Sequence, residues 1–299
     1  MKYGSKYRFI YGGIIGMLTL LAATGCIADD LSGCFRGISM KVEVDAPGEE
    51  TAVKDISLYV YDDNDKLLDI IRTDKDGTII LDYPGTTATL RCVAWGNVKN
   101  APVTVTALKP GDPLAKGFVS LQKTTGRAAA DTYRSPSDLF FGTLEIENNR
   151  TPGRTDIVKL PVSRKVASMN ITVRGFTLLA GTTSGKFSVV VHETPSRVDF
   201  TGRFSGTPAA YAPQGSLNAK NEFIVPSFNL FPTAGGAPLT VELYHEGTLL
   251  KSVTTDSAGR PIVPQVGKTL NLLLNYVGNV DVQIAITGWG DTYVWKEYL

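Results

Sequence analysis

Strict alternation of apolar and polar residues at positions 167–174 is the feature that most constrains how this chain can fold. The segment reads Ala167-Ser168-Met169-Asn170-Ile171-Thr172-Val173-Arg174. Successive side chains of a β-strand point to opposite faces, so this order predicts a strand with one buried face. Residues 38–44 repeat the pattern, and no long apolar stripe with the helical period of 3.6 occurs. We therefore expect an all-β protein.

Turn signals separate many further short strand-like segments. The chain contains 30 Gly and 16 Pro, and these cluster with Asp and Asn between apolar runs. Examples are Pro47-Gly48, Asp62-Asp63-Asn64-Asp65 and Asp74-Lys75-Asp76-Gly77. Spacing of this kind is typical of β-sandwiches. The length left after removal of the first 25 residues is enough for two such domains.

An internal repeat supports two similar domains. Residues 67–77 align without gaps to residues 249–259, and each segment follows a strand that ends in tyrosine, at Tyr61 and Tyr244. A Trp-Gly pair comes later in each half, at Trp95 and Trp289. Duplication predicts a β-sandwich at 37–155 and a second at 156–299. The alternative is that two unrelated hairpins use the same common turn residues.

The N-terminal residues predict an export signal. Lys2, Lys6 and Arg8 precede an apolar run at 10–23. The run has the length of a signal-peptide core and falls short of the about 20 residues that span a membrane. We therefore expect residues 1–25 to be a signal peptide. Residues 26–36 would then form an N-terminal linker in front of the folded body.

The end of that signal resembles the lipobox of bacterial lipoproteins. The run closes with Ala23-Thr24-Gly25-Cys26, which departs from the common pattern only at Ala23, where leucine is usual. The resemblance implies cleavage between Gly25 and Cys26 and acylation of Cys26, which would anchor the protein in the outer membrane. Asp29-Asp30 is similar to the surface-export signal of Bacteroidia lipoproteins. The alternative for Cys26 is an ordinary secretory signal with a cysteine nearby by chance. The alternative for Asp29-Asp30 is a solvated linker.

The two other cysteines form a candidate disulfide. If Cys26 carries lipid, Cys34 and Cys92 remain as a pair in an oxidising compartment. A bridge would close a loop of about 60 residues and contribute about 4 kcal/mol in the chain-entropy model. The alternative is two free thiols.

Catalytic and metal-binding patterns are absent from the sequence. The net charge of +1 gives no reason to expect a nucleic-acid partner. His192 and His245 are the only histidines and lack metal-ligand spacing, and no GxSxG or GxxxxGK[ST] motif occurs. The acidic run 62–65 lacks the glycine and terminal glutamate of a calcium loop and is interpreted as a hairpin turn. We expect no enzyme activity, no cofactor and no metal.

Several blocks resemble FimB-type fimbrial anchor lipoproteins of Bacteroidia. They are Asp29-Asp30-Leu31-Ser32-Gly33-Cys34-Phe35-Arg36-Gly37, Leu58-Tyr59-Val60-Tyr61-Asp62, Val93-Ala94-Trp95-Gly96-Asn97, Asp138-Leu139-Phe140-Phe141-Gly142 and Ser163-Arg164-Lys165-Val166-Ala167. The resemblance implies two tandem transthyretin-like sandwiches and a protein at the base of a fimbrium that holds it to the outer membrane and takes part in control of fibre length. It also implies stalk subunits as partners, joined by strand exchange.

Which strand is exchanged is left open by the sequence. Residues 276–299 form one candidate, because they are apolar, strand-like and terminal; alternatively they complete their own domain. A rival function is a surface lipoprotein that binds glycans through Trp289, Tyr293, Trp295 and Tyr298. The alternative for the tryptophans is packing in the core, which is more common for a tryptophan at the end of a strand. A third function is that of a stalk or tip subunit.

Overall fold

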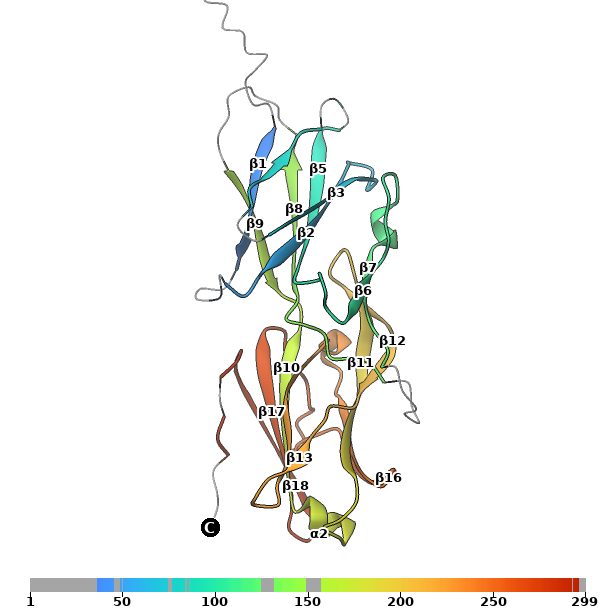
Figure 1. The fold of residues 1–299 in the computed structure, drawn as a ribbon, viewed down its shortest axis with the longest axis vertical. Coiled ribbons are helices and arrows are strands. Elements are labelled where there is room, and N and C mark those ends of the chain that lie inside the picture. Colours follow the sequence, from blue (N-terminus) through green and yellow to red (C-terminus); the bar gives the residue numbers. More distant parts are fainter. Residues whose placement is uncertain are drawn as a thin grey trace, which may run out of the picture. The chain divides into compact units, whose positions relative to one another are not determined.

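The computed structural model describes residues 37–45, 49, 51–74, 77–83, 85, 87–124, 132–148, 157–291 and 293–295. Within these residues the regular structure is almost entirely strand, with one short helix, α2 (Phe176–Ala180), and the 3-10 turns η2 (Leu114–Lys116) and η3 (Ala234–Gly236). The predicted all-β class is confirmed (Figure 1).

The first sheet has seven strands in the order β3-β2-β5-β8-β9-β1-β4. Their bounds are β1 (Ile38–Val44), β2 (Asp55–Tyr61), β3 (Leu67–Asp74), β4 (Ile79–Leu81), β5 (Thr89–Gly96), β8 (Phe140–Glu147) and β9 (Ile157–Arg164). β8 and β9 pair only at Phe140 with Arg164 and at Phe141 with Ser163. β1 and β9 run parallel, whereas the other pairs in this sheet are antiparallel.

A compact core forms between the β2-β5-β8 part and the β9-β1-β4 part of this sheet. The members that are buried come from β1, β2, β4, β5, β8 and β9 and include Met40, Leu58, Cys92, Phe140 and Leu160. Because strand side chains alternate between faces, the opposite faces of β2 and β5 carry Tyr59, Tyr61, Val93 and Trp95 into a second, larger core. Nearly every residue of β2 is therefore buried.

Two further sheets build the rest of the described structure. One has the order β13-β14-β10-β17-β18 and the other β16-β15-β11-β7-β6, with β12 paired to β11. Their bounds are β6 (Val103–Val105), β7 (Phe118–Leu121), β10 (Ala167–Arg174), β11 (Phe187–Asp199), β12 (Phe204–Tyr211), β13 (Ser216–Leu217), β14 (Phe223–Leu230), β15 (Thr240–His245), β16 (Thr248–Val253), β17 (Lys268–Tyr276) and β18 (Val280–Gly288).

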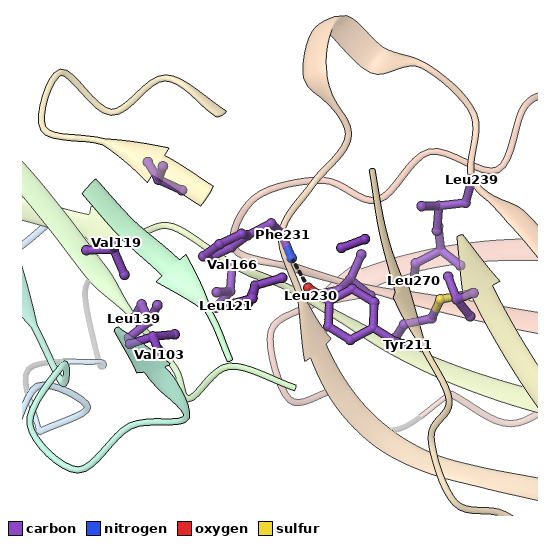
Figure 2. Close-up of a cluster of buried hydrophobic side chains, with 14 of the residues drawn as sticks. Val103, Val119, Leu121, Leu139, Val166, Tyr211, Leu230, Phe231, Leu239 and Leu270 are labelled. Atoms are coloured by element: carbon purple, nitrogen blue, oxygen red, sulfur yellow. Dashed lines mark hydrogen bonds between the residues drawn. The ribbon is translucent and has the colours of Figure 1, made fainter. Parts of the chain in front are cut away.

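The alternating segment that was expected to be a strand forms β10. Ala167, Met169, Ile171 and Val173 are buried as predicted, and they join the larger core with residues of the facing sheet. Figure 2 shows part of this core, where Tyr211 lies near Leu230 and its hydroxyl accepts a hydrogen bond from the amide of Phe231 at 3.3 Å.

Strands from both sides of residue 155 share sheets. β9 follows that residue yet pairs with β1, and β7 precedes it yet pairs with β11 through Ser120, Val119 and Phe118. The larger core likewise draws on both parts of the chain. The division into tandem transthyretin-like domains at 37–155 and 156–299 stays a prediction.

The two repeated segments contain β3 and β16, which are the second strands of two equivalent hairpins, β2–β3 and β15–β16. In each, the register shifts directly before the tyrosine, so that Tyr61 pairs with Leu67 and Tyr244 with Leu249. In each, a glycine amide then closes the next turn on an aspartate carbonyl, Gly77 on Asp74 at 3.1 Å and Gly259 on Asp256 at 3.0 Å. The repeat is therefore structural as well as sequential.

The Trp-Gly pairs do not share this equivalence. Trp95 lies in β5, which pairs with β2 of the first hairpin. Trp289 follows β18, which pairs with β17 and not with β15. The structural repeat thus covers the hairpins but does not extend to these tryptophans.

Candidate functional site

Three of the four residues assigned to sites by sequence, Gly25, Cys26 and Cys34, lie outside the described residues. Signal cleavage, acylation and the disulfide therefore stay predictions. The fourth, Cys92, is fully buried in β5. Burial raises the pKa of its thiol to about 12, so the thiolate needed for nucleophilic chemistry is suppressed at neutral pH.

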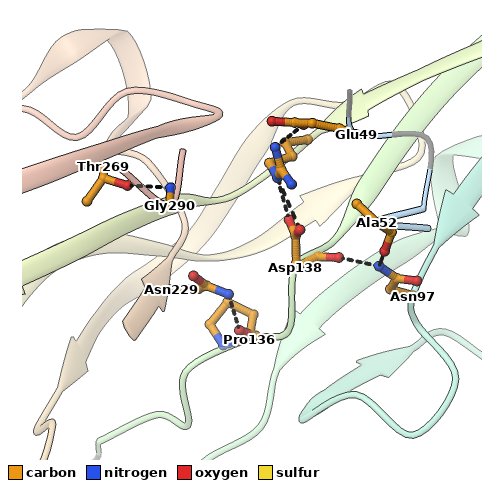
Figure 3. A network of polar contacts seen from close by, with 9 residues as sticks. Glu49, Ala52, Asn97, Pro136, Asp138, Asn229, Thr269 and Gly290 are labelled. Atoms are coloured by element: carbon orange, nitrogen blue, oxygen red, sulfur yellow. Dashed lines mark hydrogen bonds and ion pairs between the residues drawn. The ribbon is translucent and has the colours of Figure 1, made fainter. Parts of the chain in front are cut away.

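Three of the family-like blocks meet at one polar network, which Figure 3 shows. The Asn97 amide nitrogen donates to the carbonyl oxygens of Ala52 at 2.9 Å and of Asp138 at 2.8 Å. Its amide oxygen accepts from the backbone of Lys54 at 2.8 Å. Asn97 has a φ of 61°, a conformation that asparagine tolerates better than most residues. One side chain thus ties together the ends of β2, β5 and β8.

Arg164 carries the positive charge of this network. Its Nε lies 2.9 and 3.1 Å from the two carboxylate oxygens of Asp138, and its Nη1 contacts the Glu49 carboxylate. The guanidinium also lies 4.3 Å from the ring centroid of Trp289 and 5.2 Å from that of Phe140. Only 8% of the Arg164 side chain is exposed, so these partners replace water.

Burial and pairing act in opposite directions on the charges of this cluster. Burial disfavours the charged Arg164, but its hydrogen bonds to Asp138 and Glu49 outweigh that effect and hold its pKa above the ordinary value. Burial raises the pKa of the Asp138 carboxyl against the pull of Arg164, and the neighbouring charge of Glu49 adds to the rise. The cluster is a structural clamp, because Nε and Nη1 of Arg164 bind Asp138 and Glu49 and both side-chain N–H groups of Asn97 bind backbone carbonyls.

A second polar contact joins the segment before β8 to β14. The Ser135 hydroxyl donates to the Asn229 carbonyl at 2.9 Å and accepts from the Asn229 amide at 2.9 Å. The Asn229 side chain donates to the carbonyl of Pro136 at 3.2 Å. The chain that enters β8 is therefore held at both ends, by Asn229 and by Asn97.

Sheet edges are the second feature relevant to assembly. The candidate donor segment, residues 276–299, includes β18, which pairs with β17 over nine residues and is the last strand of its sheet. The structure thus pairs Val280–Gly288 with the strand that precedes it, which agrees with the alternative interpretation.

Of the aromatic residues proposed for glycan binding, the three that the structure describes have different surroundings. Trp289 packs against the core and is covered by Arg164. Tyr293 and Trp295 contact each other edge to face, with ring centroids 4.7 Å apart. Tyr298 lies outside the described residues.

Neither histidine stands in a metal-binding arrangement. His192 of β11 contacts Glu242 at 2.8 Å, and His245 at the end of β15 contacts the carbonyl of Ser184 at 2.8 Å. Across the ranges given above, no cluster of three or more His, Cys, Asp or Glu side chains could hold a metal ion. Asp62 closes the hairpin turn by accepting from the amides of Asn64 and Lys66. The helices of the described ranges are all too short or too polar to cross a membrane.

Comparison with known proteins places this architecture among structural surface proteins. The family model described as Fimbrillin-A associated anchor proteins Mfa1 and Mfa2 matches residues 31–295. The chain belongs to this family, which consists of structural anchor subunits and not of enzymes.

Individual relatives agree with that assignment. The major fimbrium anchoring subunit FimB of Porphyromonas gingivalis strain W83 is 29% identical over 306 residues, covering 95% of this chain and 98% of that protein. The fimbrial anchor protein Mfa2 from Porphyromonas gingivalis has a TM-score of 0.58 at 14% identity, covering 86% of this chain and 98% of that one. An adhesin candidate from Bacteroides ovatus has a TM-score of 0.61 at 16% identity, covering 84% and 93%. These two structures support the fold alone.

Sequence reasoning singled out the blocks around Asp138 and Arg164 but missed that they form an ion pair. The available signal was an acidic residue in one apolar block and an arginine in another. Trp289 was expected either to bind glycan or, as a tryptophan at the end of a strand, to pack in the core. It packs against the core, but its contact with Arg164 could not be read from spacing.

Proposed function

We propose that this protein is an anchor subunit that tethers a fimbrium to the outer membrane of the cell that makes it. The observation that carries the proposal is the family match over residues 31–295, which begins just after the lipobox-like cysteine. The family name and the FimB relative both denote anchoring of fimbriae. The chain is then a cell-surface protein at the base of a fimbrium.

Lipid on Cys26 supplies the membrane end of the tether. One acyl chain gives only marginal membrane binding, at about 0.8 kcal/mol per buried methylene, and stable anchoring needs two signals. The diacylglyceryl and N-acyl chains of a bacterial lipoprotein exceed that requirement. The eleven positions from Cys26 to Arg36 can span at most about 40 Å, which keeps the folded body close to the membrane.

Strand addition joins the fibre end, and the edge of β18 supports this part of the proposal. The Ser257 amide donates to the Val282 carbonyl at 2.9 Å, and the Val282 amide donates to the Ser257 hydroxyl at 2.8 Å. Val282 therefore directs its backbone groups away from β17. Because these directions alternate along an antiparallel strand, Ile284 and Ile286 do the same.

The β18 edge is open at those two residues. Among the residues described, no strand pairs with the outer side of Ile284 or Ile286, and the Ile286 side chain is 43% exposed. An unpaired edge with apolar side chains is what strand exchange requires, whether the edge receives a strand or is itself exchanged. An anchor that engages the fibre through one such edge would end the polymer there and so limit fibre length.

Replacement of Cys26 by serine in the producing cell tests the proposal. Cys26→Ser removes the acylated thiol, so the protein should leave the membrane fraction and fibres should appear in the medium by electron microscopy. Cys34→Ser, eight positions further on, is the matched control and should retain fibres on cells. Fibres that stay attached in Cys26→Ser cells contradict the proposal.

A further inference from the structure

β1 is the first strand after the segment that carries Cys26, and its pairing with β9 is parallel. Register pairs run from Ser39 with Ile157 to Val44 with Val162. The ladder continues one residue further, because the Asp45 amide donates to the Val162 carbonyl at 2.8 Å. On its other side β1 pairs antiparallel with only the three residues of β4.

Tension would enter and leave this pair at opposite ends. A pull from the membrane reaches β1 at Ile38, its N-terminal end. The chain leaves β9 at Arg164, its C-terminal end, and enters β10 after two residues. In parallel strands these two points lie at opposite ends of the ladder. The pull therefore slides one strand along the other and loads all the inter-strand hydrogen bonds together, instead of opening them one at a time.

Side chains add resistance to such sliding. Met40 and Val42 of β1 and Leu160 and Val162 of β9 are buried in the same core, so movement of β1 along its axis must drag apolar groups past close-packed neighbours. On the outer face Lys159 contacts Glu43 at 3.0 Å.

The exit point of the force is also clamped. Arg164, the last residue of β9, is held by Asp138 at 2.9 Å and by Glu49. Asp138 is in turn held through its carbonyl by Asn97. The end of β9 thus stays fixed to the sheet while β1 is pulled.

We propose that the β1–β9 pair is the force-bearing element of this protein, loaded in shear between the membrane and the fimbrium. The proposal rests on the anchoring function given above. It assigns to β1 a mechanical role in addition to its place in the core.

Single-molecule force spectroscopy on the chain from residue 26 to 299 tests this role. One handle is ligated in front of residue 26 and the other is attached through an azide side chain at position 178, on α2, where Leu178 is 70% exposed. The matched control keeps the handle at 178 and moves the other to position 80 of β4, where Ile80 is 56% exposed. Pulling there loads the edge strand β4, which is joined to β1 at only three residue pairs.

The expected result is a first rupture force through residue 26 at least about twofold higher than through position 80 at equal loading rate. Equal forces, or a weaker response through residue 26, would overturn the proposal. Each measurement is repeated with reductant, because a Cys34–Cys92 disulfide would pass the load into β5. A rupture force through residue 26 that falls on reduction assigns the load to that bridge and also overturns the proposal.

A pair of proline variants gives a second test. The Asp45 amide faces β9, so by alternation the Glu43 amide does too, whereas the Val44 amide faces away beyond the end of β4. Glu43→Pro therefore removes one bond of the ladder together with the Lys159 contact, whereas Glu43→Ala removes that contact alone and Val44→Pro removes neither. With all three variants shown to be folded by circular dichroism, Glu43→Pro should rupture at lower force than Glu43→Ala and Val44→Pro. No difference between them contradicts loading through the ladder.

The outcome is separable from that of the Cys26→Ser test. If cells with Cys26→Ser retain their fibres while the purified protein shows the directional resistance, the anchoring function fails and the mechanics stand. If fibres are shed while residue 26 yields at low force, anchoring stands and the proposal about β1 fails.

Discussion

At the scale of single residues, Arg164 has the largest consequences. It balances Asp138 and Glu49 and lies over the Trp289 ring, all at the junction between β9 and β10. Removal of one member of a buried charged cluster leaves the others without compensation, which costs more than the cluster contributes in net stability. The position therefore requires a positively charged side chain.

Arg164→Leu should lower the free energy of unfolding by about 3 kcal/mol at pH 7, because two part-buried carboxylates lose their counter-charge. Burial raises the pKa of Asp138, so protonation removes its uncompensated charge as the pH falls, and the deficit should shrink. Urea unfolding at pH 7 and pH 4.5 measures both effects. Arg164→Lys keeps the charge and serves as control. A deficit that grows on acidification would contradict this account.

At the scale of elements, close approach of β8 to β9 explains a glycine in one of the family-like blocks. A Cβ on Gly142 would overlap the carbonyl oxygen of Pro161 and press on the Val162 side chain. These strands pair only at Phe140 and Phe141, so Gly142 is where the backbones separate without a side chain between them.

Gly142→Ala should therefore destabilise the protein by about 1–3 kcal/mol, the usual cost of overpacking against backbone. Thermal unfolding followed by circular dichroism measures it, with Thr143→Ala on the exposed face of β8 as control. A melting temperature equal to that of the parent protein would show that β8 and β9 move apart freely.

The β18 edge supports a second prediction at this scale. Ile286→Lys places a charge on a side chain that is already 43% exposed, so stability should change by no more than about 0.5 kcal/mol. Strand exchange at this edge should fail, since a lysine on an edge strand disfavours pairing. Fibres on cells are the readout. Val277→Lys, on the turn before β18 with 80% exposure, is the control and should retain them.

At the scale of the whole molecule, the predicted pairing of Cys34 with Cys92 would attach the residues before β1 covalently to the folded body. With a Cys34–Cys92 bridge, reduction should lower the melting temperature, because the closed loop of about 60 residues gains entropy when unfolded and open. Mass spectrometry of the non-reduced chain identifies the bridge. Cys92→Ala loses both the bridge and the packing of the buried side chain, whereas the reduced parent protein loses the bridge alone. The difference between their melting temperatures therefore measures the packing. An unchanged melting temperature on reduction would favour two thiols.

The sequence by itself determined the strand class, the buried face of β10, the repeated hairpins and the likeness to anchor proteins. These depend on local alternation, turn chemistry and short motifs, which are written in neighbouring residues. Tertiary structure alone decided that β1 lies parallel to β9, that β7 joins β11, and that Arg164 meets Asp138, Glu49 and Trp289. Such contacts join residues far apart in the chain, and they are chosen by packing of whole sheets, for which no local spacing carries a signal.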